Sequence, residues 1–134
     1  MTINETALAN DAISVVKTKF GNLFFFDNYL ITEMFEGMIV GEKEFTKIFN
    51  LCLDIYGADK AFGIVSHRLH PYSVNLFELI SIAKKFDVVV ANAVVAYTDI
   101  SLKNFELEKR LLKFKGKSFN NLDSAISWIK KEVK

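Results

Sequence analysis

The chain has 134 residues and a mass of 15.3 kDa, which predicts one domain with enough residues for a hydrophobic core. Hydrophobic residues make up 51% of the sequence, charged residues make up 25%, and the mean hydropathy is +0.20, as in ordinary globular proteins. The net charge of +1 excludes a general electrostatic attraction to nucleic acid, and a single cysteine excludes an internal disulfide or a cysteine-based zinc site.

The beginning of the sequence carries neither the basic segment nor the apolar segment of a secretory signal. No uncharged run is long enough for a membrane-spanning helix. We expect residues 1–10 to be flexible and residues 11–134 to form the domain. With Cys52 as the lone cysteine, we expect a cytoplasmic protein.

The N-terminal third is predicted to form antiparallel strands. Residues 13–20 and 29–36 are rich in β-branched and aromatic side chains, which favours strands. Between them, Gly21-Asn22 suits a two-residue type II′ hairpin loop, because glycine accepts a positive φ at the first central position. The apolar run 23–26 follows this loop and is predicted to continue the sheet.

The apolar period changes to that of a helix after Glu42, and this helix is expected to end about 15 residues later at Gly57. The apolar residues 61–66 predict a further strand, followed by a polar loop over residues 67–72.

A helix over residues 74–86 is predicted next, capped by either Ser73 or Asn75, with Asn75 and Glu78 fitting a capping box. A strand over residues 88–97 follows, and its apolar run, interrupted only by Asn92, predicts burial on both faces. The remaining elements are a helix over 102–113, an extended piece at 117–119 and an amphipathic helix over 122–133.

This order of a hairpin followed by alternating strands and helices is typical of an α/β domain with a mixed sheet and three to four helices. Three segments also resemble a known family. They are Phe62-Gly63-Ile64-Val65-Ser66-His67-Arg68, then Pro71-Tyr72-Ser73-Val74, and residues 118–129 with the sequence Ser-Phe-Asn-Asn-Leu-Asp-Ser-Ala-Ile-Ser-Trp-Ile.

These segments resemble the STAS fold of bacterial anti-sigma-factor antagonists, and in particular an uncharacterised bacterial STAS-like branch related to lipid-binding CRAL-TRIO domains. In the antagonists, a phosphorylatable serine begins a helix within the sequence Asp-Ser-Ser-Gly-Leu. The resemblance places Ser73 at that position, without the preceding aspartate or the following glycine. The CRAL-TRIO likeness implies an apolar ligand.

Polar side chains that follow the strand at 61–66 form the candidate site, because open α/β sheets place sites at the carboxyl ends of strands. We predict a binding loop with five members: His67, Arg68, His70, Tyr72 and Ser73. The forked donors of Arg68 suit a phosphate or a carboxylate. The alternative is an ordinary solvated loop. Two histidines lack the further ligands that zinc needs, so we expect no metal and no cofactor.

No nucleophile elbow and no glycine-rich nucleotide-binding loop is present, so we do not expect an enzyme. Glu106 and Glu108 are interpreted as surface charges rather than as an acid–base pair. The basic stretch from Lys109 to Lys117 is interpreted as a solvated face, with weak contact to a membrane surface as the alternative.

Thirteen phenylalanines are many for this length, and the successive residues Phe24, Phe25 and Phe26 cannot all point to one side of a strand. Helices, a partner chain or a ligand must cover the second side. We therefore expect a homodimer. The overall prediction is a non-catalytic binding or regulatory domain that contacts another protein, with binding of a lipid or other apolar small molecule as the alternative and an unrecognised enzyme as the third.

Overall fold

A computed structural model describes residues 10–86, 88–112 and 115–133. The expected flexible segment 1–10 therefore lies outside the described residues, except for Asn10. The strands are β1 (Ser14–Lys17), β2 (Gly21–Phe25), β3 (Tyr29–Met34), β4 (Ile39–Val40), β5 (Phe62–Arg68), β6 (Ser73–Val74), β7 (Val89–Ala96) and β8 (Lys115–Phe119). The helices are α1 (Glu42–Tyr56), α2 (Leu76–Ala83), α3 (Asp99–Leu111) and α4 (Leu122–Val133).

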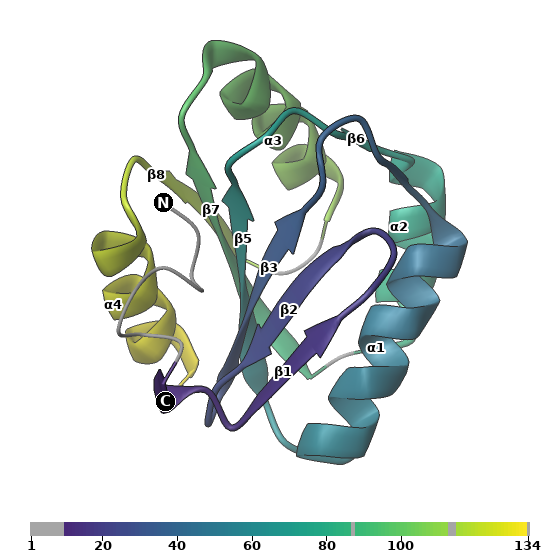
Figure 1. The fold of residues 1–134 in the computed structure, drawn as a ribbon, viewed down its shortest axis with the longest axis vertical. Coiled ribbons are helices and arrows are strands. Elements are labelled where there is room, and N and C mark those ends of the chain that lie inside the picture. Colours follow the sequence, from purple (N-terminus) through teal and green to yellow (C-terminus); the bar gives the residue numbers. More distant parts are fainter. Residues whose placement is uncertain (1–9, 87, 113–114, 134) are drawn as a thin grey trace.

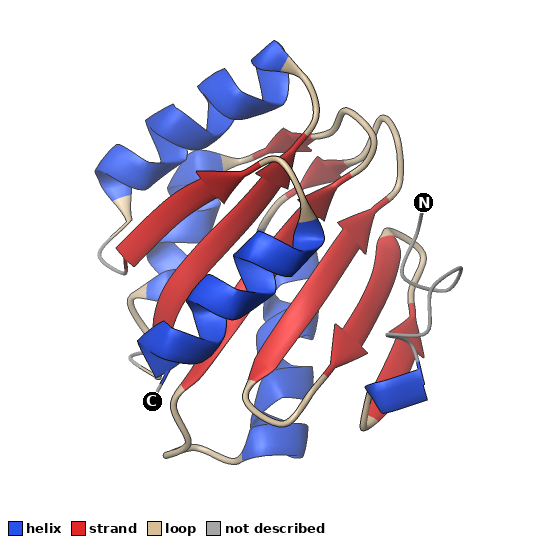
Figure 2. Cartoon of the chain, turned by 90° about the vertical axis from the view of Figure 1, so that its left-hand side faces the viewer, coloured by secondary structure: helices blue, strands red, loops and turns tan. Residues whose placement is uncertain are grey.

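Six strands form one mixed sheet in the order β1-β2-β3-β5-β7-β8. The first three strands pair antiparallel, and the pairs β3–β5, β5–β7 and β7–β8 are parallel. Helix α4 lies on one face of the sheet, and α1, α2 and α3 lie on the other (Figures 1 and 2). The predicted α/β class, with an opening hairpin, a mixed sheet and four helices among the described residues, is confirmed.

The three successive phenylalanines are buried by helices on both faces of the sheet. Phe25 packs edge-on against Tyr56 of α1, with the ring centroids 6.0 Å apart. Phe24 and Phe26 belong to the core on the α4 side. All three side chains are at most 3% exposed, so this run offers no surface to a partner chain. Self-association stays a prediction, and it would need a different surface.

The turn between β1 and β2 differs from the prediction. Lys17 pairs with Asn22, so Gly21 and Asn22 begin β2 and the chain turns through residues 18–20. The Thr18 hydroxyl holds this turn by donating to the Gly21 carbonyl over 2.7 Å. Gly21 is needed for another reason, because a Cβ there would lie 2.5 Å from the carbonyl oxygen of Glu33 on the neighbouring strand.

A two-stranded parallel pair, β4 with β6, brings the N-termini of α1 and α2 together. Asn75 caps α2 by accepting from the Glu78 amide, but the predicted capping box is only half formed, because the Asn75 backbone N–H donates to the Val40 carbonyl and not to the Glu78 carboxylate. The Glu78 carboxylate also accepts from the amide of Glu42, at the start of α1, over 2.7 Å. Helix α2 is shorter than predicted at both ends, because Val74 is a strand residue in β6 and the helix ends at Ala83 and not at residue 86.

The other predicted elements match the structure closely. Helix α1 has the expected bounds and ends at Gly57, whose φ of 83° suits glycine. Strand β7 is the expected strand buried on both faces. Helix α3 begins three residues earlier than predicted, because Thr98 caps it by accepting from the Ser101 amide. It ends at Leu111, two residues before the predicted end, because Leu112 has an extended backbone with φ −95° and ψ 143°.

Candidate functional site

The carboxyl end of β5 carries His67 and Arg68, which the sequence predicts to lie in a polar binding loop or, as the alternative, in a solvated loop. The strand continues two residues further than predicted, since His67 pairs with Val95 and Arg68 pairs with Ala96. Both side chains are buried, at 1% and 6% exposure. A polar sequence indicated a loop, but each side chain has a buried partner from a distant part of the chain.

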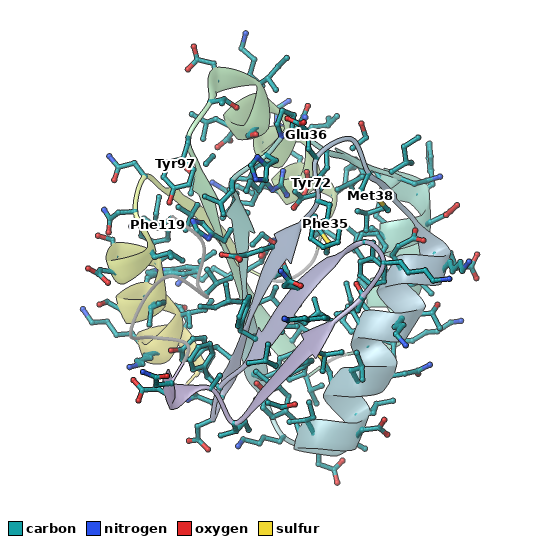
Figure 3. The ribbon with its side chains drawn as sticks, viewed as in Figure 1. Phe35, Glu36, Met38, Tyr72, Tyr97 and Phe119 are labelled. Carbon is teal, nitrogen blue, oxygen red and sulfur yellow. The ribbon has the colours of Figure 1, made fainter. Side chains whose placement is uncertain are left out.

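On the α4 face, His67 is the middle of a hydrogen-bonded chain. Its Nδ1 lies 2.7 Å from a carboxylate oxygen of Glu33, and its Nε2 lies 2.8 Å from the hydroxyl of Tyr97. Glu33 comes from β3, and Tyr97 directly follows β7. Figure 3 shows Tyr97 on the α4 side, at this end of the sheet. Burial, and to a smaller extent the charge of Glu33, raises the pKa of the Tyr97 hydroxyl, so this hydroxyl stays protonated.

On the opposite face, Arg68 makes a two-pronged ion pair with Glu108 of α3. The Arg68 Nη1 and Nη2 atoms donate to the two carboxylate oxygens over 3.0 and 2.6 Å. The ring of Tyr72 lies against the guanidinium, 5.4 Å from Cζ to the ring centroid. Burial raises the pKa of the Tyr72 hydroxyl even though the charge of Arg68 lowers it. The forked donors that were predicted to hold an anion are thus occupied by Glu108.

A cavity of about 60 Å³ lies next to this ion pair, between the sheet and helices α1 and α2. Its walls are mostly apolar and include Phe45, Ile48 and Phe49 of α1. Arg68 and Asn92 also line it. Within the described part of the chain, Arg68 Nε and Asn92 Oδ1 are buried side-chain atoms without a hydrogen-bond partner.

The remaining predicted site residues lie between β5 and α2. His70 is exposed, and Tyr72 is half-buried against Arg68. Ser73 is exposed in β6, and its amide donates to the Met38 carbonyl over 2.9 Å. Ser73 is therefore not the helix cap. The structure keeps Arg68, Tyr72 and Ser73 in one region but separates them from His67, which lies on the other face.

Several apolar side chains around Ser73 are exposed. A groove of about 200 Å³ between β6, α2 and α3 is lined by Ser73, Leu76, Asn104 and Leu107, together with Tyr72, Val74 and Glu108. Ile39 pairs with Ser73 and is 71% exposed, and Phe77 on α2 is 88% exposed. We call Ile39, Ser73, Leu76, Phe77, Asn104 and Leu107 the Ser73 surface.

Four further residues of these clusters were not predicted from the sequence: Glu33, Asn92, Tyr97 and Glu108. Glu108 was interpreted as a surface charge, yet it is only 6% exposed. Its burial agrees with helical spacing, because Ser101, Phe105 and Glu108 share the buried stripe of α3. Asn92 was visible as the single polar residue of a buried strand. Nothing in the sequence paired Glu33 or Tyr97 with His67.

The predicted basic stretch is divided between two elements. Lys109 and Arg110 end α3, whereas Lys115 and Lys117 belong to β8. Lys115 pairs with Glu132 over 3.0 Å. Among the described residues, no three His, Cys, Asp or Glu side chains gather where they could hold a metal ion, and no helix is long and apolar enough to cross a membrane.

No family model matches this sequence, and no curated protein matches it. The structure is similar to that of an uncharacterized protein from the DUF3478 family, with a SpoIIAA-like fold, from Shewanella loihica PV-4. The TM-score is 0.56 at 12% sequence identity, and the match covers 88% of this chain and 92% of that chain. The fold is therefore the SpoIIAA-like fold, which is the STAS fold of anti-sigma-factor antagonists. The CRAL-TRIO relation stays a prediction.

Proposed function

We propose that this chain is a non-catalytic, STAS-fold binding domain that acts by contacting a partner protein through the Ser73 surface. The observation that carries the proposal is the exposure of Ile39, Phe77 and Leu107, which are 71%, 88% and 57% exposed. Exposed apolar patches on soluble proteins often mark interaction sites.

Helix α3 extends this surface with an exposed apolar stripe. Ile100, Leu107 and Leu111 are 64%, 57% and 49% exposed and are spaced seven and four residues apart, so they share one side of the helix. The buried stripe of α3 is a separate one, formed by Ser101, Phe105 and Glu108. An apolar face of a partner protein fits a stripe of this kind.

Phosphorylation of Ser73 belongs to the same proposal. The side chain is exposed and its position in β6 leaves only the backbone engaged. A phosphate there would add about two negative charges to an otherwise apolar surface. It would weaken an apolar contact, because burying the phosphate against a partner would cost its desolvation.

Binding of an apolar small molecule is the second candidate function, and the cavity beside Arg68 favours it. Its volume is about 60 Å³. An engineered cavity that binds benzene in another protein is much larger, at about 150 Å³. A lipid chain would require the walls to move apart, so the cavity suits a smaller molecule.

Photochemical cross-linking in cells that produce the protein tests the proposed surface. A photoreactive phenylalanine analogue in place of Phe77 should give one discrete protein adduct. The same analogue in place of Leu53, an exposed apolar residue of α1, serves as the matched control and should give none. Leu107→Arg should abolish the adduct formed at position 77.

Equal adducts at both positions, or none at either, would contradict the proposal. An adduct at twice the 15.3 kDa mass of the chain would show a second copy on this surface instead of a different protein. That result would replace the proposed partner by self-association.

A further inference from the structure

The carboxyl ends of three neighbouring parallel strands each contribute one member of the hydrogen-bonded chain Glu33–His67–Tyr97. Glu33 lies near the end of β3, His67 lies near the end of β5, and Tyr97 directly follows β7. Open α/β sheets usually place their sites at this edge. Glu33 and His67 are 5% and 1% exposed, whereas Tyr97 is 51% exposed. A buried pair of titratable groups therefore ends at a residue that solvent reaches.

The two hydrogen bonds of the imidazole determine which of its atoms can accept a proton. An ionised carboxylate only accepts hydrogen bonds, so His67 Nδ1–H donates to Glu33 over 2.7 Å. In the neutral ring Nε2 then holds a lone pair, and the Tyr97 hydroxyl donates to it over 2.8 Å. A carboxylate, an imidazole and a hydroxyl in this order form the arrangement in which a general base activates an oxygen nucleophile.

We propose that Tyr97 is a modification site that takes an acyl group from an activated acyl donor, with His67 as its general base. In this step the Tyr97 hydroxyl oxygen attacks the carbonyl carbon of the donor, and its proton moves to His67 Nε2. The bond between the carbonyl carbon and the leaving group breaks, and the leaving group departs with that electron pair. The product is an acyl ester of Tyr97, and the proton on Nε2 then passes to water or to the leaving group.

Glu33 is a positioning residue in this step. It accepts from Nδ1–H and so keeps Nε2 free for the proton of Tyr97, and its negative charge stabilises the imidazolium that forms. The phenol cannot ionise readily by itself, because burial raises the pKa of Tyr97. Without the imidazole, the hydroxyl would react at neutral pH only through its small phenolate fraction.

This inference goes beyond the proposed protein contact and does not depend on it. Tyr97 lies on the α4 side of the sheet (Figure 3), whereas the groove of the Ser73 surface lies between β6, α2 and α3. Transfer of one acyl group to the chain itself is not turnover, so it is compatible with a binding domain. Cross-linking at Phe77 tests the surface and does not require a reactive Tyr97.

Acetylation by p-nitrophenyl acetate at about pH 7.5 tests the inference on the unmodified chain and on Leu53→Tyr. Leu53 is 38% exposed on α1 and has no part in the His67 cluster, so this variant supplies a tyrosine of similar exposure without the base. Peptide mass spectrometry measures the rate at each tyrosine, and hydroxylamine removes acetyl groups from tyrosine oxygens but not from lysine amines. Tyr97 should react about 100-fold faster than the tyrosine at position 53.

His67→Gln removes the base and should lower the rate at Tyr97 by about 100-fold. The pH profile separates this effect from a disturbed fold. Between about pH 8 and about pH 9, the rate in the unmodified chain should change less than about twofold, because proton transfer to an imidazole does not depend on the phenolate fraction. In His67→Gln it should rise by about tenfold over the same range, as the phenolate fraction does.

Glu33→Gln provides a second variant with a side chain of the same shape. It should lower the rate at Tyr97 by about tenfold at about pH 7.5, and the dependence on pH should lie between those of the unmodified chain and His67→Gln. Circular dichroism shows whether each variant is folded. If His67→Gln does not fold, the comparison with Leu53→Tyr and the effect of Glu33→Gln still decide the question.

Three results would overturn the inference. Equal rates at positions 97 and 53 would show that the imidazole does not activate the hydroxyl. A rate at Tyr97 of the unmodified chain that follows the phenolate fraction would show the same. Acetylation of His67 in place of Tyr97 would make the imidazole the nucleophile.

Discussion

His67 and Arg68 are neighbours in the chain, yet their side chains lie on opposite faces of the sheet and belong to two separate polar clusters. His67 meets Glu33 and Tyr97 on the α4 side, and Arg68 meets Glu108 on the side of α3. Successive residues of a strand point to opposite faces, so the extension of β5 by two residues separates them. Each cluster therefore has its own partners and can be altered without touching the other.

Removing one partner of the Arg68–Glu108 ion pair should destabilise the protein much more than removing both. Arg68→Met leaves the Glu108 carboxylate buried without a counter-charge and should lower the free energy of unfolding by about 3–5 kcal/mol. The double variant Arg68→Met/Glu108→Leu should recover most of that loss, because no charge then remains buried. Urea unfolding of the single and double variants measures both effects.

Lys60→Ala is the control for this prediction, since Lys60 forms an exposed pair with Asp27 at 3.5 Å and should change stability by less than about 1 kcal/mol. A loss for Arg68→Met no larger than that of the control would contradict the buried ion pair.

The cap of α2 should depend on Asn75 and not on Ser73. Asn75 accepts from the Glu78 amide over 3.2 Å, whereas the exposed Ser73 is a strand residue. Asn75→Ala should therefore cost about 1 kcal/mol of unfolding free energy, and Ser73→Ala should change it by less than about 0.5 kcal/mol. Thermal unfolding of the two variants decides this, and a larger loss for Ser73→Ala would assign the cap to Ser73 after all.

Gly21 should tolerate no side chain. A Cβ there would lie 2.5 Å from the Glu33 carbonyl oxygen and 2.8 Å from Met34 Cα, and backbone atoms of a central strand cannot move aside cheaply. Gly21→Ala is expected to cost about 1–3 kcal/mol by urea unfolding. Gly116→Ala, whose Cβ meets the end of the Phe105 ring at 3.2 Å, is the milder comparison, and an equal or smaller cost at position 21 would argue against the close approach of β2 and β3.

Tyr56 should make stability fall at alkaline pH. Its hydroxyl lies 2.7 Å from the carbonyl oxygens of both Phe26 and Tyr29, and burial raises its pKa above the ordinary value of 10.0. The folded chain holds this proton more tightly than the unfolded chain does. The stabilisation is therefore complete below pH 10 and is lost progressively as the pH rises above 10.

Tyr56→Phe removes the hydroxyl and should cost about 1–2 kcal/mol at neutral pH. Above pH 10 the variant should lose stability less steeply than the parent in a series of urea unfolding curves. A part of the decline should remain, because burial also raises the pKa of Cys52 from 9.0 to about 12. Parallel curves for the parent and the variant would show that Tyr56 does not titrate differently in the folded state.

Much of the fold could be predicted from local patterns. The 15 residues of α1, its end at Gly57, the apolar strand β7 and the apolar stripe of α4 all follow from periodicity and capping residues. The three phenylalanines in a row required cover on both faces of the sheet, and α1 and α4 provide it. These features depend on residues that are close to one another in the sequence, so local patterns are enough to predict them.

The pairs of residues that form the candidate site could not be predicted from such local patterns. Arg68 and Glu108 are 40 residues apart, and Glu33 and His67 are 34 residues apart, so no local spacing links either pair. A charged residue without a visible partner is normally solvated, which is why 67–72 was predicted as a loop and Glu108 as a surface charge.

Local sequence patterns account for the alternation of strands and helices and for the apolar faces that they bury, and they leave Ser73 and Asn75 as alternative caps of α2. The tertiary structure decided which polar side chains are buried, because burial of a charge depends on a partner that only the fold brings near. It also decided why position 21 needs glycine, which is the close approach of the neighbouring backbone and not the geometry of a turn. Long-range pairing, through the parallel register of β3, β5 and β7, placed two polar clusters at one end of the sheet and on its two different faces.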